Sequence, residues 1–340
     1  AIVDAVKNKY IPETRIDLAV YKILEAKFRL GLFENPLVDI PASRSLIYTE
    51  DHQATALEAA RQSIVLLKND NYLLPLKQGR YKKILVTGPN ANSPTIMGDW
   101  TTRQPEENVI TVLAGIQQQV PDAVIDTVCF SNKIRKMDRS LIKTAAQKAV
   151  EADINIVVVG ENSERYNSDR TCGENCDRDN LELPTHQQEL LEAVYASGKP
   201  VILVLLNGRP LSVTWAQQHI PAIVEAWEPG GMGGRAIAEI LFGKVNPSGK
   251  LPITFPRSVG QIQTVYNHKA SQYSRKFALT TTGPLYHFGY GLSYTTFEYG
   301  NPGLSKDTIH TNEAVSVSFE LANTGLCQGT EIAQLYIQDE

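Results

Sequence analysis

Two apolar runs, at residues 154–159 and 201–206, constrain the fold of this chain more than any other feature; Asn155 is the one polar residue in them. A strand whose sheet is covered on both faces carries apolar side chains on both sides, so it reads as a continuous apolar run rather than an alternating one. Shorter apolar segments predict further strands at residues 83–87, 122–129 and 222–226. Strands of this kind need helices packed on both faces of the sheet.

Helical patterns separate some of these strands and also precede and follow them. Residues 55–68 and 140–152 carry apolar side chains at helical spacing, and a third helix is predicted at residues 235–242. Thr185 is expected to cap a fourth helix, with Gln188 three positions later completing a capping box.

The alternation of strands and helices predicts one α/β domain, a three-layer α/β/α sandwich with a mostly parallel sheet, over residues 55–257. In such sheets, ligands bind beside the loops that leave the carboxyl ends of the strands. The loop after the strand at residues 154–159 is therefore a candidate functional segment.

The residues before this domain contain an amphipathic helix. Apolar side chains recur at three- and four-residue spacing from Ile16 to Phe28, and Gly31 marks the end of the pattern. We therefore assign residues 1–35 to a helical segment and residues 36–54 to an irregular linker.

The residues after the domain are of two kinds. Residues 258–312 are rich in turn formers and predict a connector. Apolar and polar side chains then alternate at residues 314–321 and 332–337, on either side of the turn Asn323-Thr324-Gly325. This pattern predicts two paired strands at the start of a β-sandwich in residues 313–340. A sandwich needs about seven strands, so we expect this one to be incomplete.

The composition excludes several classes of function. The 340 residues are 42% hydrophobic and 21% charged, as in ordinary globular proteins, and carry a formal charge of -4. Without a basic cluster, nucleic acid is not an expected partner. No apolar run reaches the roughly 20 residues that cross a bilayer, so no membrane partner is expected either. Four scattered cysteines form neither a disulfide scaffold nor a zinc site.

One charged loop stands out from this background. Glu174 lies in Gly173-Glu174-Asn175-Cys176-Asp177-Arg178, after the strand at residues 154–159 and before the helix signal at residues 183–188. The setting indicates a carboxylate positioned on a loop; the alternative is a solvated pair between Glu174 and Arg178. Cys172 and Cys176 flank Glu174, and they either bridge in an oxidising compartment or remain unpaired.

Together these segments resemble the second domain of the glycoside hydrolase family 3 enzymes, the β-glucosidases and β-xylosidases. The motifs that carry the resemblance follow one another in a fixed order: Leu66-Leu67-Lys68-Asn69-Asp70, Gly88-Pro89-Asn90-Ala91-Asn92, Gly173-Glu174 with Asp177-Arg178, Trp227-Glu228-Pro229-Gly230-Gly231, Asn246-Pro247-Ser248-Gly249-Lys250-Leu251-Pro252 and Phe288-Gly289-Tyr290-Gly291-Leu292-Ser293-Tyr294.

The resemblance implies a function for Glu174. Retaining glycosidases use two carboxyl groups about 5 Å apart, one as nucleophile and one as general acid/base. In this family the nucleophile is an aspartate on a barrel domain and the acid/base is a glutamate of the second domain, which matches Glu174. Glu161 and Glu164 are the competing carboxylates. Ser168-Asp169-Arg170 departs from the family's nucleophile motif and lies in the wrong domain.

The resemblance also implies an architecture. Residues 1–35 resemble the last helix after the barrel, and residues 313–340 resemble the start of a fibronectin-type-III-like domain. The barrel itself is expected to be absent from this chain and to act as a partner, in cis or as a separate chain. Without it we expect an inactive chain in which Glu174 is an ordinary exposed carboxylate.

Two further side chains gain expected roles. A tryptophan near the position of Trp100 lines the family's leaving-group subsite, so Trp100 is expected there or in a domain interface, and Arg178 is expected to orient the loop. The expected substrates are β-glucosides, or alternatively β-xylosides; a non-catalytic carbohydrate-binding or interaction fragment is the alternative from another class. No cofactor and no metal are implied, and the family suggests a periplasmic or secreted location.

The glycine-rich turn Gly230-Gly231-Met232-Gly233-Gly234 precedes a helix, a geometry that can hold phosphate. It lacks the lysine and hydroxyl of a P-loop and does not follow the first strand. Close packing of a strand against a helix is the interpretation we favour.

Overall fold

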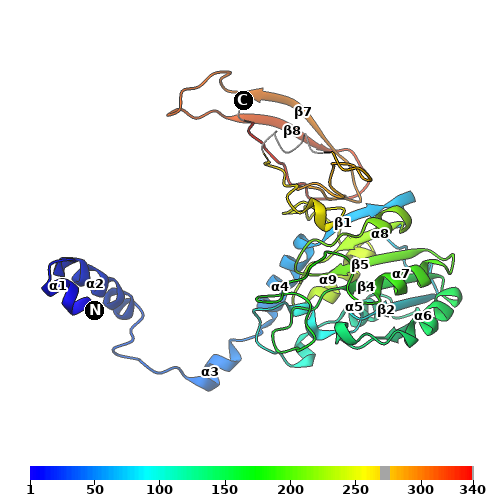
Figure 1. The fold of residues 1–340 in the computed structure, drawn as a ribbon, viewed down its shortest axis with the longest axis horizontal. Helices are drawn as coiled ribbons and strands as arrows, with labels where there is room; N and C mark the ends of the chain where they lie inside the picture. Colours follow the sequence, from blue (N-terminus) through cyan, green and yellow to red (C-terminus); the bar gives the residue numbers. More distant parts are fainter. Residues whose placement is uncertain (269–275, 339–340) are drawn as a thin grey trace. The chain divides into compact units, whose positions relative to one another are not determined.

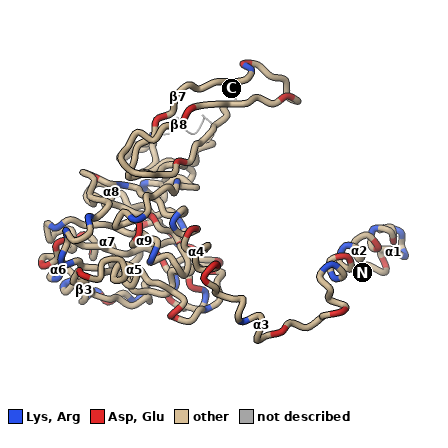
Figure 2. The backbone as a smooth tube through the Cα atoms, turned by 180° about the vertical axis from the view of Figure 1, so that it is seen from behind, with Lys and Arg blue, Asp and Glu red and all other residues tan. Residues whose placement is uncertain are grey.

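The computed structural model describes residues 1–268 and 276–338. The chain divides into two compact units, Ala1–Gln53 and Ala54–Glu340. Lys and Arg are interspersed with Asp and Glu along the backbone of both (Figure 2). Among the described residues, no helix combines the length and the apolar character that a membrane span requires.

The first unit consists of short helices. Helix α2 (Glu13–Arg29) covers the predicted amphipathic segment, and its apolar side chains Val20, Ile23 and Phe28 are exposed. Helix α1 (Ile2–Lys7) precedes it. The predicted linker is not irregular throughout, since it contains helix α3 (Ile40–Ser45). The Asp39 carboxylate caps α3 by accepting the Ala42 N–H at 3.1 Å, a local signal that six residues are too few to reveal as periodicity.

The second unit contains a six-stranded sheet in the order β1-β6-β5-β4-β2-β3. All neighbouring strands are parallel except β1, which is antiparallel to β6. The predicted mostly parallel sheet is confirmed. The strands are β1 (Val65–Asn69), β2 (Lys83–Gly88), β3 (Val124–Cys129), β4 (Ile154–Gly160), β5 (Val201–Leu206) and β6 (Ala222–Glu225).

Strand β1 corrects one prediction. The helix predicted at residues 55–68 ends earlier, because helix α4 spans Glu50–Ser63 and β1 follows directly. Val65, Leu66 and Leu67 are all buried, on alternating sides of the sheet. A short apolar run suits a helix or a strand equally well, and here pairing with β6 decides.

Helices cover both faces of the sheet (Figure 1). Strand β4 shows the two-sided burial: Ile156 and Val158 enter one hydrophobic cluster, and Val157 and Val159 enter the other. The first cluster takes side chains from α4, α5 (Val112–Gln119) and α9 (Gly233–Leu241). The second takes them from α6 (Ser140–Glu151), α7 (Gln187–Tyr195) and α8 (Thr214–His219). The three-layer sandwich is therefore confirmed, although α5 and α8 had no counterpart in the sequence prediction.

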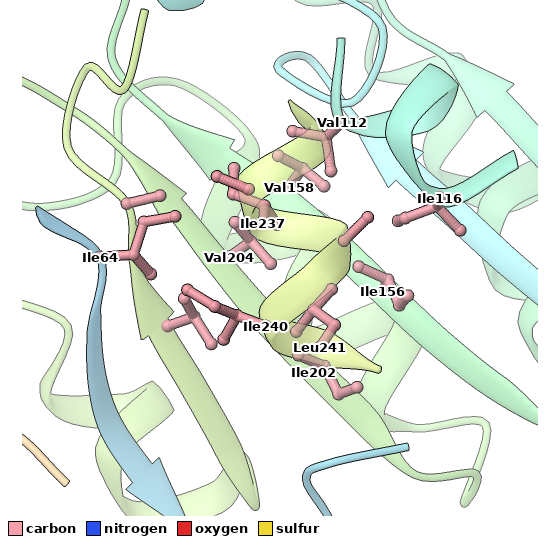
Figure 3. Close-up of a cluster of buried hydrophobic side chains, with 14 of the residues drawn as sticks. Ile64, Val112, Ile116, Ile156, Val158, Ile202, Val204, Ile237, Ile240 and Leu241 are labelled. Atoms are coloured by element: carbon pink, nitrogen blue, oxygen red, sulfur yellow. The ribbon is translucent and has the colours of Figure 1, made fainter. Parts of the chain in front are cut away.

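The core beneath α9 is made of branched aliphatic side chains. Ile237, Ile240 and Leu241 of α9 lie in one cluster with Val158 of β4 and Val204 of β5 (Figure 3). All five are fully buried. Burying side chains of this size contributes roughly 1.5–3 kcal/mol each, so this layer fixes the strands whose ends carry the functional loops.

The predicted capping box before α7 is wrong. The N-cap is His186, and Thr185 has a φ of 56°. The Thr185 hydroxyl lies within hydrogen-bond distance of the Ile134 carbonyl oxygen at 3.1 Å, and Gln188 bonds Glu192 instead of the helix start. The Thr185 hydroxyl therefore contacts Ile134, which is distant in the sequence, instead of capping α7.

The C-terminal residues form a two-stranded antiparallel sheet, but not the predicted one. Strand β8 (Val317–Asn323) pairs with β7 (Phe297–Leu304), which lies in the predicted connector. Residues 331–338 carry no strand. Gly300, Pro302 and Gly303 hide the β7 signal, because both residue types are unfavourable in strands, and the register shifts there. Short 3-10 turns complete the described structure at Asp70–Tyr72, Pro94–Met97, Glu106–Asn108, Ile134–Lys136 and Val259–Gln261.

Candidate active site

The loops of interest leave the carboxyl ends of β2 and β4 at two glycines. Gly88 and Gly160 have φ values of 117° and 133°. A Cβ atom at Gly88 would lie 2.1 Å from the carbonyl oxygen of Val158, and one at Gly160 would lie 2.1 Å from that of Leu206. Only glycine fits at these points, where the chain turns out of a packed sheet.

Glu174 lies on the loop after β4 and is held at three atoms. Its backbone N–H donates to Asp99 Oδ2 at 2.6 Å, and its carbonyl oxygen accepts from Arg170 Nη2 at 2.9 Å. Its Oε2 lies 2.8 Å from Arg165 Nη2. The side chain is 46% exposed, so a fixed backbone presents an accessible carboxylate.

Trp100 is brought close to Glu174 by the same arginine. The Arg165 guanidinium lies 3.9 Å from the centre of the Trp100 ring, a cation–π contact. Trp100 is 76% exposed, so the described chain does not bury it in an interior or an interface. An exposed aromatic face and a carboxylate are thus joined through one guanidinium.

Arg178 does not pair with Glu174. Its Nη1 lies 3.1 Å from Glu161 Oε1, and its Nη2 donates to Asn180 Oδ1 at 2.9 Å and to the Glu182 carbonyl oxygen at 2.7 Å. Arg178 therefore connects the second half of the loop to the end of β4. The solvated Glu174–Arg178 pair considered from the sequence is not present.

Glu161 lies beneath the loop rather than on its surface. It is buried, and Arg209 Nε approaches its second oxygen at 3.1 Å. Arg209 also donates to the Cys176 carbonyl oxygen at 2.9 Å. Burial raises the pKa of Glu161, although the charges of Arg209 and Arg178 oppose that change. Of the two competing carboxylates, Glu161 is thus a buried residue that binds Arg178 and Arg209 and so holds the loop to the end of β4.

Glu164 lines a neighbouring pocket of about 230 Å³ together with Gly98, Thr101 and Tyr166. Neither Glu174 nor Trp100 contributes to its lining.

Two more carboxylates, one at the end of β6 and one just after it, were not singled out from the sequence. Glu225 is fully buried, accepts hydrogen bonds from the Trp227 N–H and from Asn207, and burial raises its pKa to about 8. Glu228 accepts from the Ser163 hydroxyl, and burial raises its pKa as well. Their signal was weak, because each lies inside an apolar or glycine-rich segment.

All four cysteines are free thiols, so Cys172 and Cys176 are not bridged in this structure. Cys172 is buried, and its pKa is raised to about 12 by burial and by the nearby Glu161 and Glu228 carboxylates. A thiol with such a pKa is almost entirely protonated at neutral pH and a poor nucleophile.

The glycine-rich turn before α9 is filled by packing. A Cβ atom at Gly234 would lie 2.1 Å from the Thr111 carbonyl oxygen, and one at Gly231 would lie 2.8 Å from that of Asn108. Close packing accounts for these glycines, as the sequence suggested. Across the described residues, no group of three or more His, Cys, Asp or Glu side chains is arranged to hold a metal ion.

Sequence comparison decides the family. The model of the glycosyl hydrolase family 3 C-terminal domain matches residues 64–294, well over half of the chain. The chain belongs to glycosyl hydrolase family 3.

Curated family 3 relatives are similar along almost all of this chain. A β-xylosidase of Formosa agariphila is 38% identical over 335 residues, covering 96% of this chain and 45% of that protein. A periplasmic β-glucosidase of Salmonella typhimurium is 38% identical over 370 residues, covering 98% and 47%. The chain therefore spans about half the length of these family 3 relatives.

Solved family structures agree with the fold. A β-glucosidase from Erythrobacter marinus has a TM-score of 0.81 and 34% identity, covering 95% of this chain and 46% of that one. A β-glucosidase from Listeria innocua in complex with isofagomine has a TM-score of 0.77 and 28% identity, covering 95% and 50%.

Proposed function

We propose that Glu174 is the general acid/base of a retaining β-glycosidase. Its carboxyl group would protonate the glycosidic oxygen while a separate carboxylate attacks the anomeric carbon. In the second step the Glu174 carboxylate would take a proton from the water that cleaves the glycosyl–enzyme intermediate. The observation that carries the proposal is an exposed carboxylate whose backbone is fixed on both sides by Asp99 and Arg170.

Trp100 and Arg178 have supporting roles in this proposal. The exposed ring of Trp100 is joined to Glu174 through Arg165, so a sugar stacked on the ring would lie beside the acid, as expected for a leaving-group subsite. Arg178 orients the loop from its second half, through the buried Glu161 carboxylate.

The nucleophile is proposed to lie outside this chain. Glu161 and Glu225 are buried and hydrogen-bonded, Glu228 is half-buried and accepts from the Ser163 hydroxyl, and Asp99 is engaged by two arginines. We therefore propose a family 3 barrel domain, in cis or as a separate chain, as the partner, and no hydrolysis by the 340 residues alone.

The proposed substrates are terminal non-reducing β-D-glucosyl residues. A β-xyloside is the second candidate, because a β-xylosidase and a β-glucosidase among the relatives are equally similar to this chain at 38% identity. The periplasmic β-glucosidase relative supports a periplasmic or secreted location.

The test compares aryl β-glucosides and aryl β-xylosides, first with this chain alone and then with the complete enzyme, meaning this chain together with its barrel domain. Glu174→Gln should lower kcat/KM by about 10²–10⁴-fold for a phenyl leaving group, the usual contribution of a general acid. The loss should be much smaller for 2,4-dinitrophenol, which leaves without a proton.

Glu164→Gln is the matched control, because it removes a carboxylate from the same loop that is not bonded to Glu174. It should leave both rates within about twofold, since surface changes usually cost under 0.5 kcal/mol. Sugar binding without hydrolysis by the complete protein would favour the non-catalytic binding fragment. A uniform loss across leaving groups would show that Glu174 is not the acid.

A further inference from the structure

Asp99 is the common partner of every group that holds Glu174. Its Oδ2 accepts the Glu174 N–H, and its Oδ1 lies 3.2 Å from Arg165 Nε and 3.4 Å from Arg170 Nη1. Those two arginines bind the Glu174 carboxylate and carbonyl oxygen. One carboxylate thus fixes the acid directly and also fixes the two cations that contact it.

The Asp99 side chain is well placed for this task. It is only 9% exposed, so water competes weakly for its oxygens and its charge-assisted hydrogen bonds are strengthened. Gly173 packs against it: a Cβ atom there would lie 2.9 Å from Asp99 Oδ2, and φ at Gly173 is 99°. The loop backbone approaches Asp99 this closely because Gly173 has no side chain.

Asp99 also links the position of the proposed acid, Glu174, to that of the Trp100 ring. It directly precedes Trp100, while Asp99 and Glu174 are 75 positions apart in the sequence. Since Asp99 binds the Glu174 backbone, its position sets the distance between the ring and the carboxyl group. A shift of either loop would separate the leaving group from its proton donor.

We infer that Asp99 is a positioning residue, which holds the Glu174 carboxyl group at the leaving-group oxygen. This inference rests on the proposed function of Glu174. Misplacing a reacting group by about 1 Å can cost on the order of 100-fold in rate. Loss of Asp99 should therefore reduce catalysis in the manner of a displaced acid.

The kinetic test uses the complete enzyme with phenyl and 2,4-dinitrophenyl glycosides. Asp99→Ala should lower kcat/KM, which reports the glycosyl-transfer step, about 10–100-fold for the phenyl substrate and much less for the dinitrophenyl substrate, which needs no acid in that step. Asp99→Asn keeps an acceptor for the Glu174 N–H but loses the charge that holds both arginines, so its loss should be intermediate.

Asp169→Asn is the matched control. Asp169 is a buried aspartate of the same loop, paired with Arg135 at 4.0 Å and Lys136 at 3.8 Å but not bonded to Glu174. Any loss in this variant should be equal for both substrates. An equal loss for both substrates in the Asp99 variants would reduce Asp99 to a structural residue and overturn the inference.

A second readout does not depend on catalysis. Hydrogen exchange of the Glu174 amide, measured in the 340-residue chain, should be at least about tenfold faster in Asp99→Ala, since tenfold corresponds to one modest hydrogen bond. Asp169→Asn should not change it. Unchanged exchange in Asp99→Ala overturns the inference even if Glu174 is the acid. Faster exchange together with an active Glu174→Gln enzyme would instead refute the proposed function and leave the Asp99 contact in place.

Discussion

Gln187 and Gly160 exchange two hydrogen bonds: the Gly160 N–H donates to Gln187 Oε1 at 2.7 Å, and Gln187 Nε2 donates to the Gly160 carbonyl oxygen at 2.9 Å. The side chain of the first residue of α7 thereby satisfies both backbone polar groups of the last residue of β4. The loop that carries Glu174 begins and ends at this pair, so its two ends lie together whatever the residues between them do.

Replacing Gln187 should destabilise the domain. Gln187 is fully buried, and Gln187→Leu leaves a backbone N–H and a carbonyl oxygen without partners. Each such group costs about 1–3 kcal/mol, so we expect the free energy of unfolding to fall by roughly 3 kcal/mol in urea denaturation. Gln188→Leu is the neighbouring control; it loses only a bond to Glu192, and an equal effect there would contradict the explanation.

Glu225 should make stability depend on pH. Its pKa is raised to about 8 in the folded chain by burial, above the unfolded value of about 4.3. The folded state therefore holds the extra proton between these values, and the stability gained from the neutral form is full below about pH 4 and lost as pH rises toward 8.

The slope for this one group is at most about 1.4 kcal/mol per pH unit. Urea denaturation of wild type and Glu225→Gln across pH 5–8 measures it. The variant should have a flatter profile and should be the more stable protein at pH 8. Its amide can bond Asn207 if the Asn207 amide turns over, since Asn207 Oδ1 has no partner. Parallel profiles would mean that Glu225 does not titrate in this range.

Gly115→Ala separates helix propensity from packing. Alanine is favoured over glycine in a helix interior by about 1 kcal/mol, but a Cβ atom at this position in α5 would lie 2.1 Å from the Gly234 carbonyl oxygen of α9. The clash should dominate and lower the free energy of unfolding by about 2–3 kcal/mol, as overpacking does. Gly300→Ala has open space and should be close to neutral; thermal unfolding of both variants tests the comparison.

Trp100→Ala should affect disaccharides more than aryl glycosides with small leaving groups. Stacking on an exposed ring is worth about 1 kcal/mol, so KM for a disaccharide should rise about fivefold in the complete enzyme, with kcat less affected. His219→Ala is a control, because that ring stacks on Trp215, on another part of the domain, at 4.5 Å. A fall in kcat alone would place Trp100 outside the leaving-group subsite.

The sequence predicted the strands that are buried equally on both faces. Strands β4 and β5 are buried on both faces, and such burial leaves a continuous apolar run. The sequence could not place β1, because its short apolar run is equally compatible with a helix. It could not place β7 either, because the glycines and the proline of that strand are typical of turns. The local sequence pattern of a strand does not show which other strand it will pair with.

The same limit applies to the candidate site. Glu174 and Trp100 could be named because they lie in recognisable motifs, but the Asp99–Glu174 hydrogen bond joins residues 75 positions apart and leaves no local trace. Arg178 was close to Glu174 in the sequence, yet it binds Glu161 in the structure. A long charged side chain can reach several partners, and tertiary packing decides which of them it binds.

The buried Glu225 lies in the sheet layer, while Glu174 and Trp100 lie on exposed loops. On the proposed roles of Glu174 and Trp100, stability and activity would rest on separate sets of residues, and a designer could work on one without disturbing the other. Neutralising Glu225 would make the protein more resistant to alkaline conditions, and that reserve could then offset the destabilising loop changes needed to accept a different sugar.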